Sequence, residues 1–364
     1  MTRALRLIVL CAMLLGLPLL GIVIAGKPVG PYLEFPPKTH YVEHAPFSWA
    51  AFIALAAFLI VVISPFVIQG MTGRQKASER PSVRSWRLPW WGWAGMVWTV
   101  AAWVVAWNRF SWVGPLQRHT FFPLWAGYIL VVNALTYHRT GRCPLTDRTG
   151  SYLVLFPLSA AFWWFFEYLN RFVQNWYYVG SDFDAWAYFW YATLSFSTVL
   201  PAVLATREWI HSFSWPSARF RDVFPIRMAH PRAVSGAVLV VAGAGLAGIG
   251  VWPNLLFPLL WVSPMLILVS LQGLASETNV FSPVAQGAWE GIVTAAVSAL
   301  VCGVFWEMWN AGSCARWIYT IPYVHRFQVF EMPILGYAGY LPFGVECVIV
   351  MNLLTGEAGG NCRA

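Results

Sequence analysis

Residues 303–350 read GVFWEMWNAGSCARWIYTIPYVHRFQVFEMPILGYAGYLPFGVECVIV, and the interpretation of the rest of the chain starts from this stretch. It ends one apolar span with Glu307 and Asn310, crosses an aromatic loop and enters a second apolar span that contains Glu346. An ionisable residue at the centre of a membrane helix costs about 2.5–3.5 kcal/mol on insertion scales. Acids in such spans therefore predict a functional site.

The composition of the chain predicts a membrane protein. Of its 364 residues, 59% are hydrophobic and only 10% are charged, and 23 are tryptophans. This combination excludes an ordinary soluble domain and indicates a polytopic membrane protein. The net charge of +8 does not predict a nucleic-acid partner, because the basic residues lie in short runs between apolar spans and form no recognised binding motif.

Apolar stretches of roughly 17–25 residues are long enough to cross a bilayer as helices. The sequence predicts ten of them, at residues 5–25, 47–68, 90–107, 121–137, 152–169, 185–205, 233–252, 254–271, 288–309 and 334–354. The predicted fold class is thus an all-α polytopic membrane protein. The first span resembles a signal peptide, but its apolar core is long and Gly26-Lys27-Pro28 is a poor cleavage site, so we expect a retained anchor.

The basic residues predict the orientation. Most of the 23 lysines and arginines fall in segments that lie inside if the N-terminus is cytoplasmic, and cytoplasmic loops hold such an excess. We therefore expect a plasma (inner) membrane protein with both termini in the cytoplasm. The loops after Glu167 and Glu307 would face the external side.

Two four-span units of the sequence can be aligned. FEYLN (166–170) matches WEMWN (306–310), and a Trp-x-Tyr word follows each, at Trp176 and at Trp317. Parallel repeats of this kind place a site at their interface. The predicted domains are 1–88, two N-terminal helices with an outer loop and a basic inner linker; 89–232, the first four-helix repeat with a basic linker; and 233–364, the second repeat with a short tail.

The acid and the amide of each motif are three residues apart and share a helix face. We expect Asn170 and Asn310 to orient the carboxyl groups of Glu167 and Glu307. A carboxyl group in low dielectric tends to keep its proton and can donate it to a substrate, and Glu346 is the most deeply placed candidate. A structural alternative is that Arg171 or Arg316 pairs with the nearby glutamate and fixes the helix end.

The loop between the last two spans supplies further candidates. His325 is a possible proton carrier or a solvated loop histidine, and Glu331 is expected to pair with Arg326. The predicted substrate-binding residues are Trp306, Trp309, Trp317, Tyr319, Arg316, Arg326, His325 and Glu331. No metal and no cofactor are expected, because the cysteines and histidines lack ligand spacing. The pattern GAGLAG (243–248) matches GxGxxG, but no strand follows it, so we expect close helix packing there.

The Glu, Asn, Trp-x-Tyr and proline–acid pattern resembles that of the small integral-membrane lycopene cyclases and related carotenoid-modifying proteins. The matching positions are Glu307, Asn310, Trp317, Tyr319, Pro342 and Glu346, with Glu167, Asn170, Trp176 and Tyr178 in the first unit. The resemblance implies repeated hydrophobic helices and acids that protonate a polyene end. The chain departs from that family at residues 341–346, where one acid stands in place of a paired Pro-Glu-Glu element.

These observations favour a cofactor-independent membrane enzyme that acts on an apolar lipid or isoprenoid by proton transfer from glutamates within the membrane. Such a protein would have membrane lipids and an apolar small molecule as its partners. A proton-coupled transporter or lipid-binding protein is the alternative, and a structural subunit of a membrane complex is a third. A blind apolar cavity would favour the enzyme, and a polar path across the membrane would favour transport.

Overall fold

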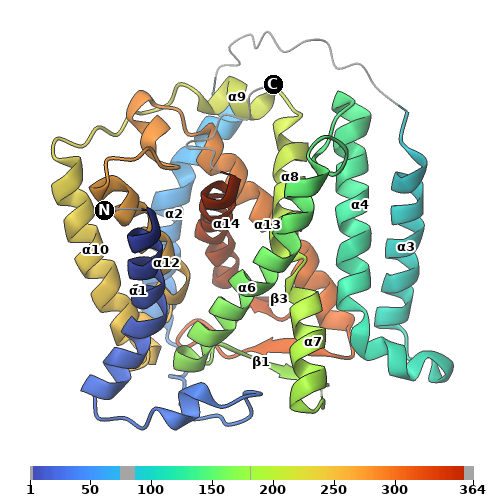
Figure 1. Cartoon of the computed structure of the whole chain (residues 1–364), viewed down its shortest axis with the longest axis horizontal. Helices are drawn as coiled ribbons and strands as arrows, with labels where there is room; N and C mark the ends of the chain where they lie inside the picture. Colours follow the sequence, from blue (N-terminus) through green and yellow to red (C-terminus); the bar gives the residue numbers. More distant parts are fainter. Residues whose placement is uncertain (1–2, 74–86, 181, 356–364) are drawn as a thin grey trace.

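The computed structural model describes residues 3–73, 87–180 and 182–355, and this part of the chain is mostly helical. Its long helices form a bundle with broadly aligned axes (Figure 1). Among the described residues, six segments are long and apolar enough to cross a membrane: Trp49–Thr72, Thr149–Val173, Ala185–His211, Pro231–Gly248, Glu290–Gly312 and Ile334–Leu353. The predicted helical class is therefore confirmed, whereas ten crossings stay a prediction.

Each predicted span overlaps a helix. The longer helices are α1 (Arg3–Ile24), α2 (Trp49–Thr72), α3 (Trp90–Trp107), α4 (Phe121–Thr140), α6 (Thr149–Val173), α7 (Ala185–Phe196), α8 (Val199–His211), α10 (Pro231–Gly248), α12 (Leu259–Leu274), α13 (Glu290–Gly312) and α14 (Tyr340–Thr355). The short helices are α5 (Pro144–Asp147), α9 (Trp215–Phe220), α11 (Pro253–Leu256), η1 (Gly30–Leu33), η2 (Ser111–His119), η3 (Ser282–Gln286) and η4 (Ile334–Gly339). The span predicted at 185–205 is divided between α7 and α8, and Pro201 lies in the first turn of α8, where a missing N–H is tolerated.

Close helix packing depends on glycines. α10 packs against both α1 and α12. A Cβ added to Gly21 of α1 would overlap the backbone of Ala247, and one added to Gly245 would crowd Leu259 of α12. The GAGLAG word therefore belongs to a helix that needs small residues for its contacts, as the sequence pattern predicts.

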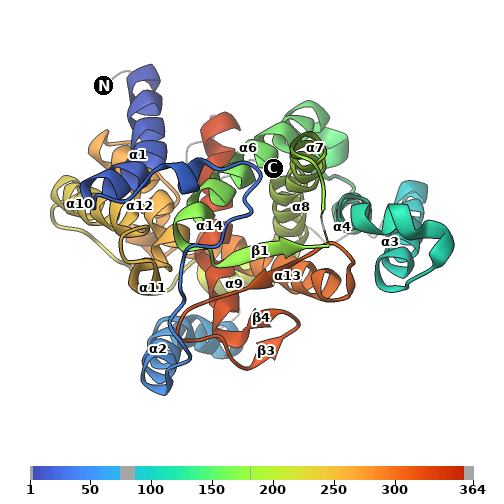
Figure 2. The ribbon, with the colours of Figure 1, turned by 90° about the horizontal axis from the view of Figure 1, so that it is seen from below.

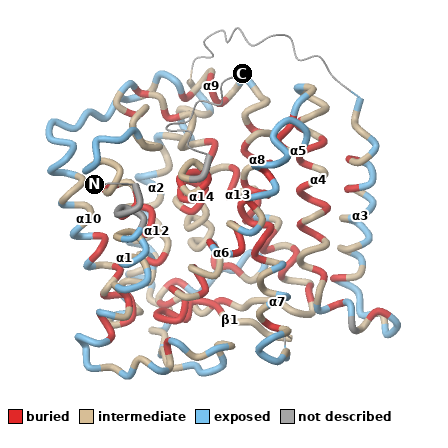
Figure 3. The backbone as a smooth tube through the Cα atoms, in the orientation of Figure 1, coloured by how far each residue is buried: buried red, intermediate tan, exposed pale blue. Residues whose placement is uncertain are grey.

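The buried core lies in the centre of the bundle and the outer helices are largely exposed (Figure 3). On α14, Val345, Cys347 and Val348 are at most 4% exposed. A helix that is apolar and buried on all sides is a core helix. By contrast α2 has no buried residue, and an apolar helix in that condition needs lipid or a partner to cover it.

Two short strands cross one end of the bundle. β1 (Trp176–Val179) follows α6, β2 (Arg316–Tyr319) follows α13, and the two pair antiparallel (Figure 2). We call this pair the ribbon and the end where it lies the ribbon end. A second pair joins β3 (Gln328–Val329) to β4 (Met332–Pro333).

The loop at residues 27–46 crosses the ribbon end and is bonded to the end of α6. The backbone N–H of Tyr41 donates to Gln174 Oε1 at 2.9 Å. The Nε2 atom of His44 lies 2.9 Å from the carbonyl oxygen of Val173. The loop therefore shields the C-terminal carbonyl groups of α6, which have no partners within the helix.

Candidate functional site

Glu167 sits near the end of α6 and is 6% exposed. Its Oε1 atom accepts hydrogen bonds from the indole N–H groups of Trp163 and Trp176, both at 3.0 Å, and from the Tyr178 hydroxyl at 2.6 Å. Trp163 is one helical turn before Glu167, and side chains two apart on a strand point to the same side. Local spacing thus directs three donors at one carboxylate.

Glu307 occupies the matching position on α13 and is fully buried. Its Oε1 atom accepts from the hydroxyls of Tyr319 at 2.8 Å and Tyr340 at 2.6 Å. The Trp317 indole N–H donates to the Tyr319 hydroxyl at 2.9 Å. The second oxygen, Oε2, has no hydrogen-bond partner within the described part of the chain.

The two amides make a different contact from the one expected. Asn310 Nδ2 donates to the carbonyl oxygen of Trp317, and its Oδ1 accepts from the N–H of the same residue, both at 2.8 Å. Asn170 brackets the backbone of Trp176 in the same way, at 2.8 and 3.4 Å. The prediction that these amides orient the carboxyl groups is therefore wrong. They bond instead to the backbone N–H and C=O of Trp317 and Trp176, because buried backbone groups need hydrogen-bond partners.

The ribbon brings the two motifs together. Trp176 lies opposite Tyr319, and Tyr178 lies opposite Trp317. Each strand therefore contributes one indole and one phenol to the same face of the ribbon. Because the strands are antiparallel, each indole lies opposite a phenol. Since side chains opposite one another in a ladder are in contact range, the partners of Glu167 and of Glu307 form one aromatic layer.

Two further aromatic contacts follow the same reciprocal pattern. Trp125 of α4 lies against Trp306 of α13, with ring centroids 5.0 Å apart. Trp261 of α12 stacks on Phe166 of α6 at 5.1 Å. The words FPLW (122–125) and FPLLW (257–261) can also be aligned, so that Trp125 corresponds to Trp261, as Phe166 corresponds to Trp306 in FEYLN and WEMWN. α4 thus places a tryptophan against α13, and α12 places one against α6.

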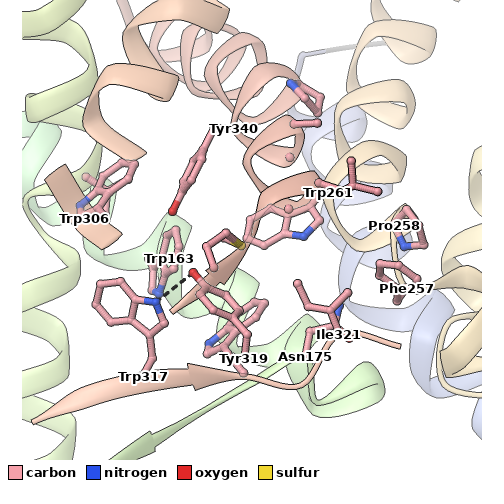
Figure 4. A pocket seen from close by; sticks show the side chains of 18 of the residues that line it. Trp163, Asn175, Phe257, Pro258, Trp261, Trp306, Trp317, Tyr319, Ile321 and Tyr340 are labelled. Atoms are coloured by element: carbon pink, nitrogen blue, oxygen red, sulfur yellow. Dashed lines mark hydrogen bonds between the residues drawn. The ribbon is translucent and has the colours of Figure 1, made fainter. Parts of the chain in front are cut away.

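A cavity of about 450 Å³ lies between the ribbon and the helices. This volume is within the range of about 300–1,000 Å³ that is common for small-molecule sites. Its lining includes Trp163, Trp261, Trp306, Trp317 and Tyr340 (Figure 4). Trp176 lines it too. The phenols Tyr178 and Tyr319 also line it, whereas the carboxyl groups of Glu167 and Glu307 lie behind this wall and meet the cavity through their aromatic partners.

Burial affects the phenols of the ribbon. Desolvation, and after it the neighbouring Glu167 carboxylate, raises the pKa of Tyr178 well above its ordinary value. Desolvation followed by the Glu307 carboxylate does the same to the pKa of Tyr319. Both hydroxyls therefore keep their protons at neutral pH and act as donors to the carboxylates.

Glu346 lies deeper in the bundle. It is 1% exposed, and its Oε2 has no partner among the described residues. Pro342, one helical turn earlier on α14, lines the cavity, and residues four apart share a helix face. Glu346 is therefore placed one turn below the cavity and is not among its lining residues.

The charged loop residues form other pairs than those expected. Arg316 lies 3.8 Å from Glu331. Arg326 instead stands over the rings of Phe47, at 5.0 Å, and Trp49, at 5.5 Å. The expected Glu331–Arg326 pair is therefore replaced, because an aromatic cluster offers the guanidinium a cation–π site. Arg316 also lines the cavity.

Neither Arg171 nor Arg316 pairs with Glu167 or Glu307, as the structural alternative had proposed. Arg171 forms its ion pair with Glu34 at 3.5 Å, and Arg316 pairs with Glu331. Indole and phenol groups bond to the carboxylates instead. The helix ends are thus fixed by the amides and the ribbon.

Four of the predicted binding residues, Trp309, His325, Arg326 and Glu331, are not among the residues that line the cavity. His325 is bonded to the Gln328 side chain at 2.9 Å, and burial lowers its pKa. Trp309 is 2% exposed and packs its ring edge-on against Trp125, with centroids 5.2 Å apart. Both have structural surroundings, and neither is among the cavity-lining residues.

Sequence reasoning missed Tyr340 as a partner of Glu307 and Trp163 as a partner of Glu167. For Trp163 a signal existed, since it stands one helical turn before the acid. Tyr340 is 33 residues from Glu307, and no local spacing connects them.

No family model, no curated protein and no solved structure matches the chain.

Proposed function

We propose that the chain is a multi-pass protein of the plasma membrane that crosses it ten times, with both termini in the cytoplasm. Arginines gather toward the end opposite the ribbon, where α4 ends and α9 and α10 begin (Figure 1). They are Arg139, Arg142, Arg148, Arg219, Arg221, Arg227 and Arg232. The cytoplasmic side of membrane proteins carries such an excess, so the ribbon would face outward.

The proposal includes two parallel four-helix units that begin at α3 and at α10. In support, α3 packs on α4 as α10 packs on α12. The reciprocal contacts of Trp125 and Trp261 and the reversed order of Trp and Tyr across the ribbon agree with an axis along the membrane normal. α1 and α2 would be additions to this core.

The proposed ligand is a long apolar molecule such as an isoprenoid or a carotenoid-like polyene. The observation that carries this proposal is the aromatic cavity, in which indole and phenol groups form most of the wall near the two buried carboxylates. A solely structural subunit needs no such space. A wall of this composition suits an apolar ligand better than an ion path.

The proposed chemistry is proton transfer through a phenol. When Glu307 is protonated, the hydrogen bond to Tyr340 reverses: Glu307 donates to the phenol oxygen, and the Tyr340 hydroxyl proton is free to face the ligand. A ligand double bond takes that proton while Glu307 gives its own to the phenol oxygen, so the tyrosine stays neutral and Glu307 becomes a carboxylate. The ligand is left as a carbocation, whose charge the tryptophan faces stabilise. The Glu307 carboxylate, acting through the Tyr340 hydroxyl, then takes a proton from a neighbouring ligand carbon, which leaves a neutral product and returns Glu307 to its protonated form. Glu346 is the proposed second acid, and Glu167 with Tyr178 forms the equivalent pair.

Replacing Glu307 tests the chemistry. The variant Glu307→Gln keeps the size of the side chain but has no proton to give, so turnover is expected to fall at least about a hundredfold. The chain would be expressed in cells that accumulate a linear polyene, and extracted pigments compared by chromatography. Glu277→Gln, an exposed acid at the opposite end, is the control. Full turnover by Glu307→Gln at normal membrane accumulation would overturn the assignment.

A second measurement addresses binding alone. Lipids that copurify with the chain would be extracted and identified by mass spectrometry. Enrichment of one long apolar species over the bulk membrane is expected. A profile identical to that of the bulk membrane, from both the native chain and a cavity-filling Gly336→Trp variant, would contradict a ligand-binding cavity.

A further inference from the structure

The cavity has an aliphatic side and a cationic side. α2 and α7 lie on opposite sides of the ribbon (Figure 2), and residues of both line the cavity. On α2 the lining residues are Leu55, Phe58, Leu59, Val62 and Ile63. Their spacing of three and four places all five on one helix face, so the wall at this side is hydrocarbon.

The other side is lined by two arginines. Arg118 of η2 and Arg316 of β2 both line the cavity. The two segments meet through aromatic rings, because the ring of Phe121, three residues after Arg118, lies 5.8 Å from that of Trp317, the residue next to Arg316. α7 and α4, the helix that follows η2, are in contact, so this is the α7 side.

The two arginines differ in their ion pairs. Arg118 is exposed and forms no ion pair within the described residues. Arg316 has Glu331 as a partner, at the long separation of 3.8 Å, and donates to the carbonyl oxygen of Ala311. The guanidinium fork suits carboxylate and phosphate oxygens.

We infer that the cavity takes an amphiphile with an anionic oxygen head, held by Arg118 and Arg316, and a single hydrocarbon chain that runs beneath the ribbon to the face of α2. This inference rests on the proposed binding of a long apolar molecule and specifies its class. The head is a phosphate or a carboxylate, because both present the same oxygens to a guanidinium. A neutral polyene would offer no anionic oxygen to Arg118, which forms no ion pair within the described residues.

Direct binding of matched ligands tests the inference. The full-length chain, captured in discs of neutral phosphatidylcholine, would be titrated with radiolabelled farnesyl monophosphate and with farnesol, and separately with palmitate and hexadecanol. Empty discs give the background. Variants Arg118→Gln and Arg109→Gln would be compared, since Arg109 lies at the same end and bonds to carbonyl oxygens of Ala106 and Gly312 without lining the cavity.

We expect each anionic ligand that binds to do so at least about tenfold more tightly than its alcohol, and Arg118→Gln to remove about tenfold of that preference. Arg109→Gln should leave the preference unchanged. The farnesyl and palmitoyl arms decide between phosphate and carboxylate. Equal binding of acid and alcohol, unaffected by Arg118→Gln, would overturn the anionic head and leave the apolar cavity intact. Failure of all four ligands to bind would overturn the proposed function as well.

Discussion

Tyr340 lies over Gly303, and the two are so close that a Cβ at position 303 would overlap the phenol ring. Gly303 stands one helical turn before Glu307, where the other motif has Trp163 one turn before Glu167. The missing side chain on α13 is thus replaced by a ring from α14, whose hydroxyl donates to Glu307 at 2.6 Å.

Replacing Gly303 with alanine is therefore expected to displace the Tyr340 ring. Crowding of a packed core costs typically about 1–3 kcal/mol, and the loss should appear as a lower melting temperature in detergent. Gly291→Ala on the same helix is the control, because a Cβ there meets no atom within 4 Å. Equal melting temperatures for the two variants would contradict the close packing.

Replacing Asn310 with leucine should weaken the join between α13 and the ribbon. The substitution leaves the N–H and the carbonyl group of Trp317 without their side-chain partner, and an unsatisfied buried polar group costs about 1–3 kcal/mol. Thermal unfolding would measure the loss. Asn108→Ala removes an amide that bonds an exposed carbonyl at the end of α3, and it should change stability by no more than about 0.5 kcal/mol.

The loop across the ribbon end is expected to loosen in acid. Desolvation lowers the pKa of His44 below its ordinary value, with smaller contributions from His325 and His40. A lowered folded-state pKa means that stability is present above the unfolded pKa of about 6.5 and is lost as the pH falls below it. Melting temperatures at pH 7.5 and 5.5 would show this loss. His44→Gln keeps a donor for Val173 and does not titrate, so its loss should be smaller.

Asn175 tests how well the polar groups that line the cavity are satisfied by the protein itself. It is 3% exposed, lines the cavity, and its Oδ1 has no partner among the described residues (Figure 4). Asn175→Leu should therefore stabilise delipidated protein by about 1 kcal/mol. A lower melting temperature would mean that the amide has a partner in the folded state.

The positions of the helices were predictable because a bilayer selects long apolar stretches, and each such stretch in this sequence overlaps a helix. The burial of Glu307 and Glu346 was predictable for the same reason. The partners of Glu307 were only half predictable: Tyr319 stands in the adjoining Trp-x-Tyr word, whereas Tyr340 reaches the acid from another helix.

The role of the amides was not predictable from spacing. A helix face tells which side chains are neighbours on one element, and Asn310 and Glu307 are such neighbours. It does not tell that a strand returns over that face and offers its backbone. The pairing of Arg316 with Glu331 and of Arg326 with aromatic rings depends in the same way on how the loop folds back.

The ribbon also has a consequence for biosynthesis. An isolated two-stranded pair is marginally stable, and β1 leaves the ribosome long before β2 exists to pair with it. The indole and phenol donors of Glu167 all lie within residues 163–178 and are made together with it. Until β2 is translated, however, β1 has no strand to pair with. Insertion of the first half should therefore yield a protease-sensitive intermediate that becomes resistant only once the last helices have been translated.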